Sequence, residues 1–162
     1  MWKGRRNVLV FCALFCAAGA NALTVENFKE AGGAASFSFG YFEVKNVEMK
    51  DGMLVLPLER DEYKNIKILT KDLYQKMSAC FVSCDLGHAK KPGYKTGEVR
   101  TTGKTVIADV VFDGELAVTF TVSKYASGGK ERLRVNKPSD FVFKDKNFEK
   151  EVKEYIKKEV YK

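Results

Sequence analysis

Apolar and polar side chains alternate most regularly in the second half of the chain, where they predict an antiparallel meander. Every second residue between 116 and 123 is large and apolar, and a period of two is typical of a half-buried strand. Glycine-containing turns flank this segment on both sides. We expect strands at 98–102, 105–111, 116–123 and 131–135. In the central pair, we expect Val106, Ala108 and Val110 to lie opposite Phe120, Val118 and Leu116, respectively.

The first half of the chain carries strand signals that are less regular. Aromatic side chains change face at Gly40, so the pattern predicts one strand over 36–49 with a bend at that glycine. Asp51-Gly52 is a hairpin turn signal. A two-residue loop there would pair Met49 with Leu54 and Val47 with Leu56. A further short strand is expected at 63–69.

Three other segments follow a helical period. Thr24 is a suitable N-cap for a short helix that ends at about Ala31, before Gly32-Gly33. From Thr70 to Cys84 apolar residues recur at steps of three and four, which predicts a helix that ends near Gly87. A C-terminal amphipathic helix is expected from about Asp145. Its apolar stripe consists of Phe148, Val152, Tyr155, Ile156 and Val160.

These elements predict an α+β fold with a mainly antiparallel sheet, built from a hairpin and a meander. A central helix and the C-terminal amphipathic helix would pack on that sheet. Internal repeats and linkers are not apparent, so we expect residues 23–162 to form a single domain.

Residues 1–22 have the three parts of an export signal. Lys3, Arg5 and Arg6 form a positive segment, an apolar run follows from residue 8 to 18, and Ala20-Asn21-Ala22 matches a cleavage site. The run is shorter than the about 20 residues that span a bilayer. We therefore expect cleavage after Ala22, a mature chain with no transmembrane segment, and a periplasmic or secreted location.

Composition and charge limit the classes of partner. The apolar content of 45% excludes a disordered or collagen-like chain. Removal of the signal takes away three cations and lowers the net charge from +7 to +4. This modest charge, and the lack of a nucleic-acid-binding motif, argue against DNA or RNA as a partner. We expect the partner to be an envelope component or another exported protein.

The chain offers few signs of catalysis. It contains one histidine, His88, and it lacks the G-x-S-x-G, H-E-x-x-H and Walker motifs. We predict no catalytic residue. A hydrolase with an unmarked carboxylate site remains an alternative, because the carboxylates are numerous.

Cys80 and Cys84 are the two cysteines that remain after signal removal. An exported protein with two cysteines favours a disulfide. In an undistorted helix, residues four apart hold their Cβ atoms too far apart for one, so the last helical turn would have to tighten or unwind. Buried free thiols and metal ligation are the alternatives.

The segment from Cys80 to His88 has C-x3-C-x3-H spacing. It resembles the dinuclear copper loop of cytochrome oxidase subunit II and nitrous oxide reductase. That resemblance implies copper, and the residue types also suit zinc, with Cys80, Cys84 and His88 as ligands. The chain departs from the family's motif at Lys91, where the family has methionine, and it lacks the second histidine. We keep a small copper, zinc or thiol-redox protein as an alternative and carry over no electron transfer.

Two basic features are candidate binding sites. One is the loop with His88, Lys90, Lys91, Tyr94 and Lys95. The other is the strand in which Lys130, Arg132 and Arg134 share one face. Arg100 and Lys104 would lie on the same outer surface if neighbouring strands pair in order. We therefore predict a small, non-enzymatic binding protein that recognises an anionic ligand through this loop and strand face.

Overall fold

The computed structural model describes residues 22–58 and 65–162. The predicted export signal, apart from Ala22, lies outside these residues, as does the start of the strand predicted at 63–69. Across the described part of the chain, no helix has the length and apolar character that a membrane span requires.

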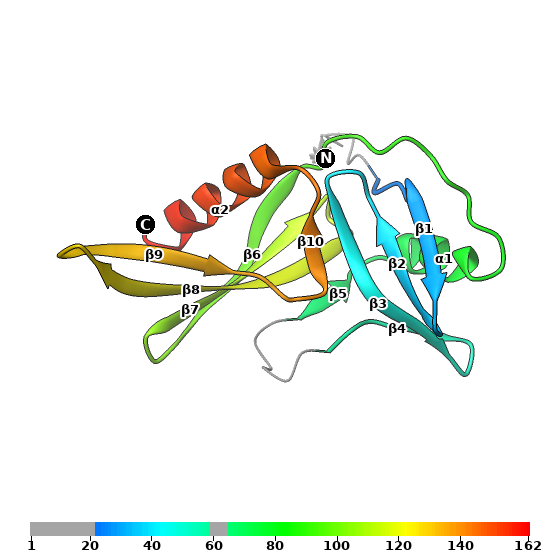
Figure 1. Cartoon of the computed structure of the whole chain (residues 1–162), viewed down its shortest axis with the longest axis horizontal. Coiled ribbons are helices and arrows are strands. Elements are labelled where there is room, and N and C mark those ends of the chain that lie inside the picture. The colour runs from blue at the N-terminus through cyan, green and yellow to red at the C-terminus, as the bar shows by residue number, and fades with distance from the viewer. Residues whose placement is uncertain (1–21, 59–64) are drawn as a thin grey trace, which may run out of the picture.

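The first sheet holds the N-terminal strands and one strand from near the C-terminus. Its order is β1 (Asn27–Ala31), β2 (Ala34–Ser38), β3 (Phe42–Lys50) and β10 (Phe141–Phe143), and β4 (Met53–Val55) also pairs with β3. All of these pairs are antiparallel. Figure 1 shows this sheet on the right, with β10 as its edge strand on the side of the second sheet.

The helix predicted from Thr24 to about Ala31 is wrong, because the structure has strand β1 there. Gly32 and Gly33 both have positive φ, of 63° and 82°. Such a pair makes a two-residue hairpin turn as readily as it ends a helix. The hairpin places Phe28 opposite Phe37, with ring centroids 5.0 Å apart, and this cross-strand contact favours the strand.

The single strand predicted over 36–49 is likewise two strands. The chain reverses at Gly40, whose φ is 77°, and Phe37 then pairs with Val44 across β2 and β3. The change of face at Gly40 therefore marks a hairpin and not a bend. At the Asp51-Gly52 turn, the predicted pair of Met49 and Leu54 is confirmed.

The second sheet is the predicted meander with a short strand added. Its order is β5 (Ile66–Ile68), β8 (Leu116–Ser127), β7 (Thr105–Phe112) and β6 (Tyr94–Thr102), and β9 (Lys130–Asn136) pairs with β8. Strand β6 begins four residues before the predicted start, so Tyr94 and Lys95 belong to a strand. Strand β8 continues to Ser127 and forms a long hairpin with β9, seen on the left of Figure 1.

The predicted register between β7 and β8 is wrong by two residues. Val110 lies opposite Val118, and Phe112 lies opposite Leu116, because Phe112 belongs to β7 and the three-residue loop runs from Asp113 to Glu115 instead of from 112 to 114. Asp113 and Gly114 make this tight loop possible with φ of 47° and 74°. A shift of two residues keeps every side chain on its face, so the predicted core face is unchanged.

Helix α1 (Lys71–Cys80) is capped by Thr70, whose hydroxyl accepts from the N–H of Leu73. Leu73, Met77 and Cys80 are buried, as the stripe predicted. The helix ends before the predicted boundary at Gly87, because the chain leaves through a closing turn in which Ser83 donates to Ala79.

Helix α2 (Lys146–Val160) begins at the expected place, with Asp145 as its N-cap. It buries Phe148, Val152 and Ile156 and lies over the second sheet (Figure 1). The α+β class with antiparallel sheets and a C-terminal amphipathic helix is confirmed.

Phenylalanines join the two sheets into one buried cluster. The ring of Phe42 from β3 lies 5.0 Å from those of Phe112 in β7 and Phe141 in β10. Phe141 in turn lies 6.1 Å from Phe120 in β8. Such contacts add stability beyond the apolar area they bury, so the sheets are held together both directly, by Phe42 and Phe112, and through Phe141 of β10.

Candidate functional site

Cys80 and Cys84 form a disulfide at the end of α1. The helix stops at Cys80 and the chain turns back, which is the distortion that a bridge over four residues was expected to need. A disulfide sulfur is not a thiolate, so metal ligation by both cysteines would require reduction. The structure thus selects the first of the three interpretations of this pair.

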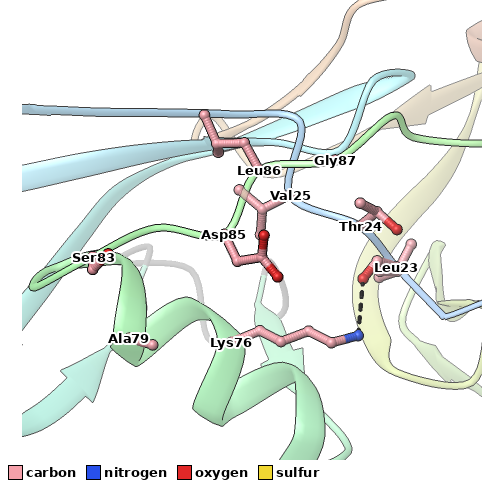
Figure 2. A pocket seen from close by; sticks show the side chains of 9 residues that line it. All are labelled: Leu23, Thr24, Val25, Lys76, Ala79, Ser83, Asp85, Leu86 and Gly87. Carbon is pink, nitrogen blue, oxygen red and sulfur yellow. Dashed lines mark hydrogen bonds between the residues drawn. The ribbon is translucent and has the colours of Figure 1, made fainter.

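A pocket of about 360 Å³ lies close to the disulfide, with Ala79 and Ser83 in its lining. Its walls come from the N-terminal segment, from α1, and from the chain after the disulfide (Figure 2). The lining residues are Leu23, Thr24, Val25, Lys76, Ala79, Ser83, Asp85, Leu86 and Gly87. None of these described residues is a histidine or a free thiol, and Asp85 is the one carboxylate among them. Its polar side chains are those of Thr24, Lys76, Ser83 and Asp85.

Lys76 connects two sides of this pocket, helix α1 and the N-terminal segment. Its ammonium donates to the carbonyl oxygen of Leu23 at 3.4 Å (Figure 2). Leu23 and Val25 are both buried, each with 3% exposure. The N-terminal segment is therefore part of the folded structure, and the pocket lies against it.

The fold places the residues of the predicted basic loop in different surroundings. Lys91 donates to Glu151 of α2 at 2.6 Å, and the Tyr94 hydroxyl donates to the other oxygen of that carboxylate at 2.8 Å. Hydrogen bonds from Lys91 and then Tyr94 lower the pKa of Glu151. Burial, together with the hydrogen bond to Glu151, raises the pKa of Tyr94 to about 12. Lys91 and Tyr94 thus connect the loop to α2, and the charge of Lys91 is paired with Glu151 of the same chain.

The other three residues of that loop lie apart from this contact. His88 is 90% exposed, and its Nδ1 is 3.3 Å from Glu26. Lys90 is exposed. Lys95 pairs with Val111 in the sheet, so it points to the face opposite Tyr94. The structure therefore does not bring the loop's cations together.

The three cations of strand β9 do share a face. Lys130, Arg132 and Arg134 are exposed, and they lie opposite Ser127, Tyr125 and Ser123 of β8, respectively. The intervening Glu131 faces the other side, where it pairs with Lys124 at 2.6 Å. We call the exposed side of β9, with Lys130, Arg132 and Arg134, the basic face.

The basic face has no counter-charge in the described part of the chain. None of its three cations forms an ion pair with a described carboxylate. Arg134 lies over the ring of Tyr125, with its guanidinium carbon 5.3 Å from the centroid. This cation–π contact orients the guanidinium and leaves its charge in place.

Neighbouring strands extend this face with hydroxyl groups and a further cation. Arg134 is level with Ser123 and Thr105 across β8 and β7. Arg100 of β6 lies opposite Ile107, on the same side of the sheet, as the sequence predicted. Lys104 lies in the turn between β6 and β7.

Two partners of the candidate site escaped sequence analysis. Tyr125 joins the basic face because β8 is four residues longer than predicted, and Glu151 pairs with Lys91 from a helix 60 residues away. An alternating pattern extended through Lys124 and Tyr125 would have indicated the longer strand β8 and so the position of Tyr125. No local signal indicates the second.

Comparison with known proteins adds no relative to this picture. No protein-family model, no curated protein and no solved structure matches the chain.

Proposed function

We propose that this is an exported, non-enzymatic binding protein that recognises an extended anionic polymer through its basic face. Export rests on the three-part signal in residues 1–22. The observation that carries the binding proposal is the row of Lys130, Arg132 and Arg134 on one exposed face, unpaired with any described carboxylate. The disulfide between Cys80 and Cys84 is compatible with an oxidising compartment.

The spacing of the cations suits a linear ligand. Alternate residues of a strand are about 7 Å apart, so the three charges cover about 13 Å along β9. Arg100, whose guanidinium lies 3.9 Å from Glu98, is three strands away, or about 14 Å across the sheet, and two residues along β6 from the position level with Arg134. A chain with charges repeated every few ångströms can meet several of these cations together, whereas a single small anion meets one or two.

The surroundings of the cations favour an acidic polysaccharide as the polymer. Ser123, Ser127 and Thr105 lie among the charges on the same face, and hydroxyl groups can donate to and accept from sugar hydroxyls. Tyr125 adds an aromatic surface to this row. Arginine provides paired donors that match the oxygens of carboxylate or sulfate groups.

Binding to dextran sulfate, with neutral dextran as the uncharged comparison, tests this proposal on the processed protein. The variant Arg132→Glu/Arg134→Glu should lose about tenfold or more in affinity, because like charges then face the polymer. The matched control is Lys29→Glu/Lys71→Glu, which changes the net charge equally but lies on β1 and α1. Its affinity should fall by less than about threefold, and thermal melts check that both variants are folded.

Each other outcome overturns a definite part of the proposal. Equal losses in the two double variants would mean attraction by net charge alone. A loss confined to Lys90→Glu/Lys91→Glu would move the site to the loop. Binding to anionic phospholipid vesicles without binding to dextran sulfate would replace the polymer with a membrane surface.

A further inference from the structure

Glu115 is a buried carboxylate that the proposed binding function does not use. It is 8% exposed and is the one ionisable side chain in the buried class among the described residues. It stands in the three-residue loop between β7 and β8, and its backbone carbonyl accepts from the N–H of Leu69. A buried carboxylate is costly unless a cation or several donors compensate it.

The strongest contact of this carboxylate is with the backbone of Leu23. The Leu23 N–H donates to Glu115 Oε2 at 2.6 Å, across 92 positions of sequence. The other oxygen accepts from the Thr70 hydroxyl at 3.4 Å. Both donors are neutral while Leu23 is inside a continuous chain, and no described lysine, arginine or histidine forms an ion pair with Glu115.

Leu23 is also the residue that follows the Ala20-Asn21-Ala22 cleavage site. Hydrolysis of the Ala22–Leu23 peptide bond by an endopeptidase consumes one water. It releases Ala22 as a carboxylate and leaves the Leu23 nitrogen as an ammonium. That nitrogen is the atom that lies 2.6 Å from Glu115. Processing would therefore turn a neutral donor into a cation at the one buried carboxylate.

We propose that Glu115 is the binding site for the new N-terminus, and that a buried ion pair between the Leu23 ammonium and Glu115 completes the fold after signal removal. This inference rests on the export part of the proposed function and is independent of the basic face. The remaining contacts of the segment hold Leu23 in position without residues 1–21. Lys76 binds its carbonyl oxygen, and Gly87 donates to Val25.

The burial of Leu23 also sets an order of events. Its side chain is 3% exposed, and a peptidase needs an extended, accessible chain on both sides of the bond. Cleavage therefore precedes the docking of Leu23, and docking then buries the new charge. An unprocessed chain lacks the ion pair, so it remains the less stable form.

A double-mutant cycle tests the ion pair. One chain begins at Leu23, and its partner is extended by residues 20–22, which restores a neutral peptide N–H at position 23. Each is unfolded in urea with and without Glu115→Gln. In the chain that begins at Leu23, the substitution should lower the folding equilibrium constant about ten- to a hundredfold, as for a hydrogen bond between charged groups. In the extended chain the loss should stay below about tenfold.

Glu151→Gln is the matched control, because Glu151 also accepts two hydrogen bonds but lies far from the N-terminus in sequence. Its effect should be equal in both chains. Equal effects of Glu115→Gln in both chains would overturn the ion pair and leave only an amide hydrogen bond. If the Gln variant does not fold, the reaction of the α-amine with 2-pyridinecarboxaldehyde provides the decision. The amine of the chain that begins at Leu23 should react about tenfold more slowly than that of the extended chain, and equal rates would refute the proposal.

The N-terminal sequence of the exported protein separates this inference from the proposed function. A first residue other than Leu23 would overturn both processing at Ala22 and the ion pair. Failure to bind dextran sulfate, with the double-mutant cycle intact, would overturn only the polymer-binding proposal.

Discussion

Truncation of Phe148 to alanine should release helix α2 from the sheet and lower the stability of the whole protein. Phe148 is 2% exposed. Its ring lies 5.4 Å from that of Tyr41, 5.7 Å from that of Tyr94 and 5.9 Å from that of Phe143. These neighbours come from three separate segments, so they cannot all move into the space that the ring leaves.

The expected loss follows from that environment. Buried phenylalanine-to-alanine changes cost about 3–5 kcal/mol, and poor relaxation around the cavity raises the cost. Aromatic pairs add about 0.5–1.5 kcal/mol each beyond area burial. We therefore expect about 4 kcal/mol or more, which for a chain of this size lowers the melting temperature by about 10–15 °C.

Urea unfolding followed by far-ultraviolet circular dichroism measures this loss. The neighbouring substitution Asn147→Ala changes an exposed residue of the same helix and should stay within about 0.5 kcal/mol. Ile156→Ala, two turns further on and 1% exposed, should cost about 2–5 kcal/mol. A loss below about 1 kcal/mol for Phe148→Ala would refute the docking of α2 on the second sheet.

Three further predictions concern single groups. Cys84→Ser should cost about 2 kcal/mol or less, because a bridge to Cys80 over four residues restricts the unfolded chain little; urea melts measure it. In an absorbance titration of the tyrosines, Tyr94 should ionise near pH 12, and Glu151→Gln should bring its pKa back toward 10. Because its pKa is raised, Tyr94 contributes stability that is full below pH 10 and is lost as the pH rises toward 12. Burial raises the pKa of Asp113, so folding favours its protonated, neutral form. The stability that this gives is present at acidic pH and is lost as the pH rises. Thermal melts at pH 7 should therefore show that Asp113→Asn is neutral or stabilising.

Each of these has an outcome that contradicts it. A Cys84→Ser chain that does not fold would give the bridge a larger role than its short loop allows. Tyrosine titration complete by pH 10.5 would mean that Tyr94 is not bonded to Glu151. Strong destabilisation by Asp113→Asn at pH 7 would mean that its negative charge is required, since asparagine tolerates the positive φ of this position and can still accept from Gly93.

Local patterns allowed the strands of the second sheet and the C-terminal helix to be predicted, because alternation and a helical stripe are both properties of neighbouring residues. Gly32-Gly33 shows where this approach fails. Two glycines permit a helix end or a hairpin equally, and the choice was made by the contact of Phe28 with Phe37. Such a contact depends on the paired strand and is not contained in either segment alone.

In the candidate site as well, the sequence indicates contacts between neighbouring residues and not contacts with distant ones. Lys130, Arg132 and Arg134 share a face because strand geometry requires it, so the sequence predicted them together. Lys91 and Tyr94 also looked like parts of a site. The fold instead brings Glu151 from a distant helix to bind both of them. Nothing near residues 91–94 in the sequence indicates that partner. Lys91 and Tyr94, which were predicted to bind a ligand, therefore form a contact within the fold.

The pairing of β10 with β3 has a consequence for biosynthesis. Phe141 lies beside Val44, so the N-terminal sheet gains its last strand only from a segment almost a hundred residues later. Contacts of such high sequence separation slow folding, since a long loop must close before they form. A nascent chain of this protein cannot complete its first sheet until residue 143 has left the ribosome. The segment that contains β10 must therefore be available to pair with β3 before the first sheet can fold cooperatively.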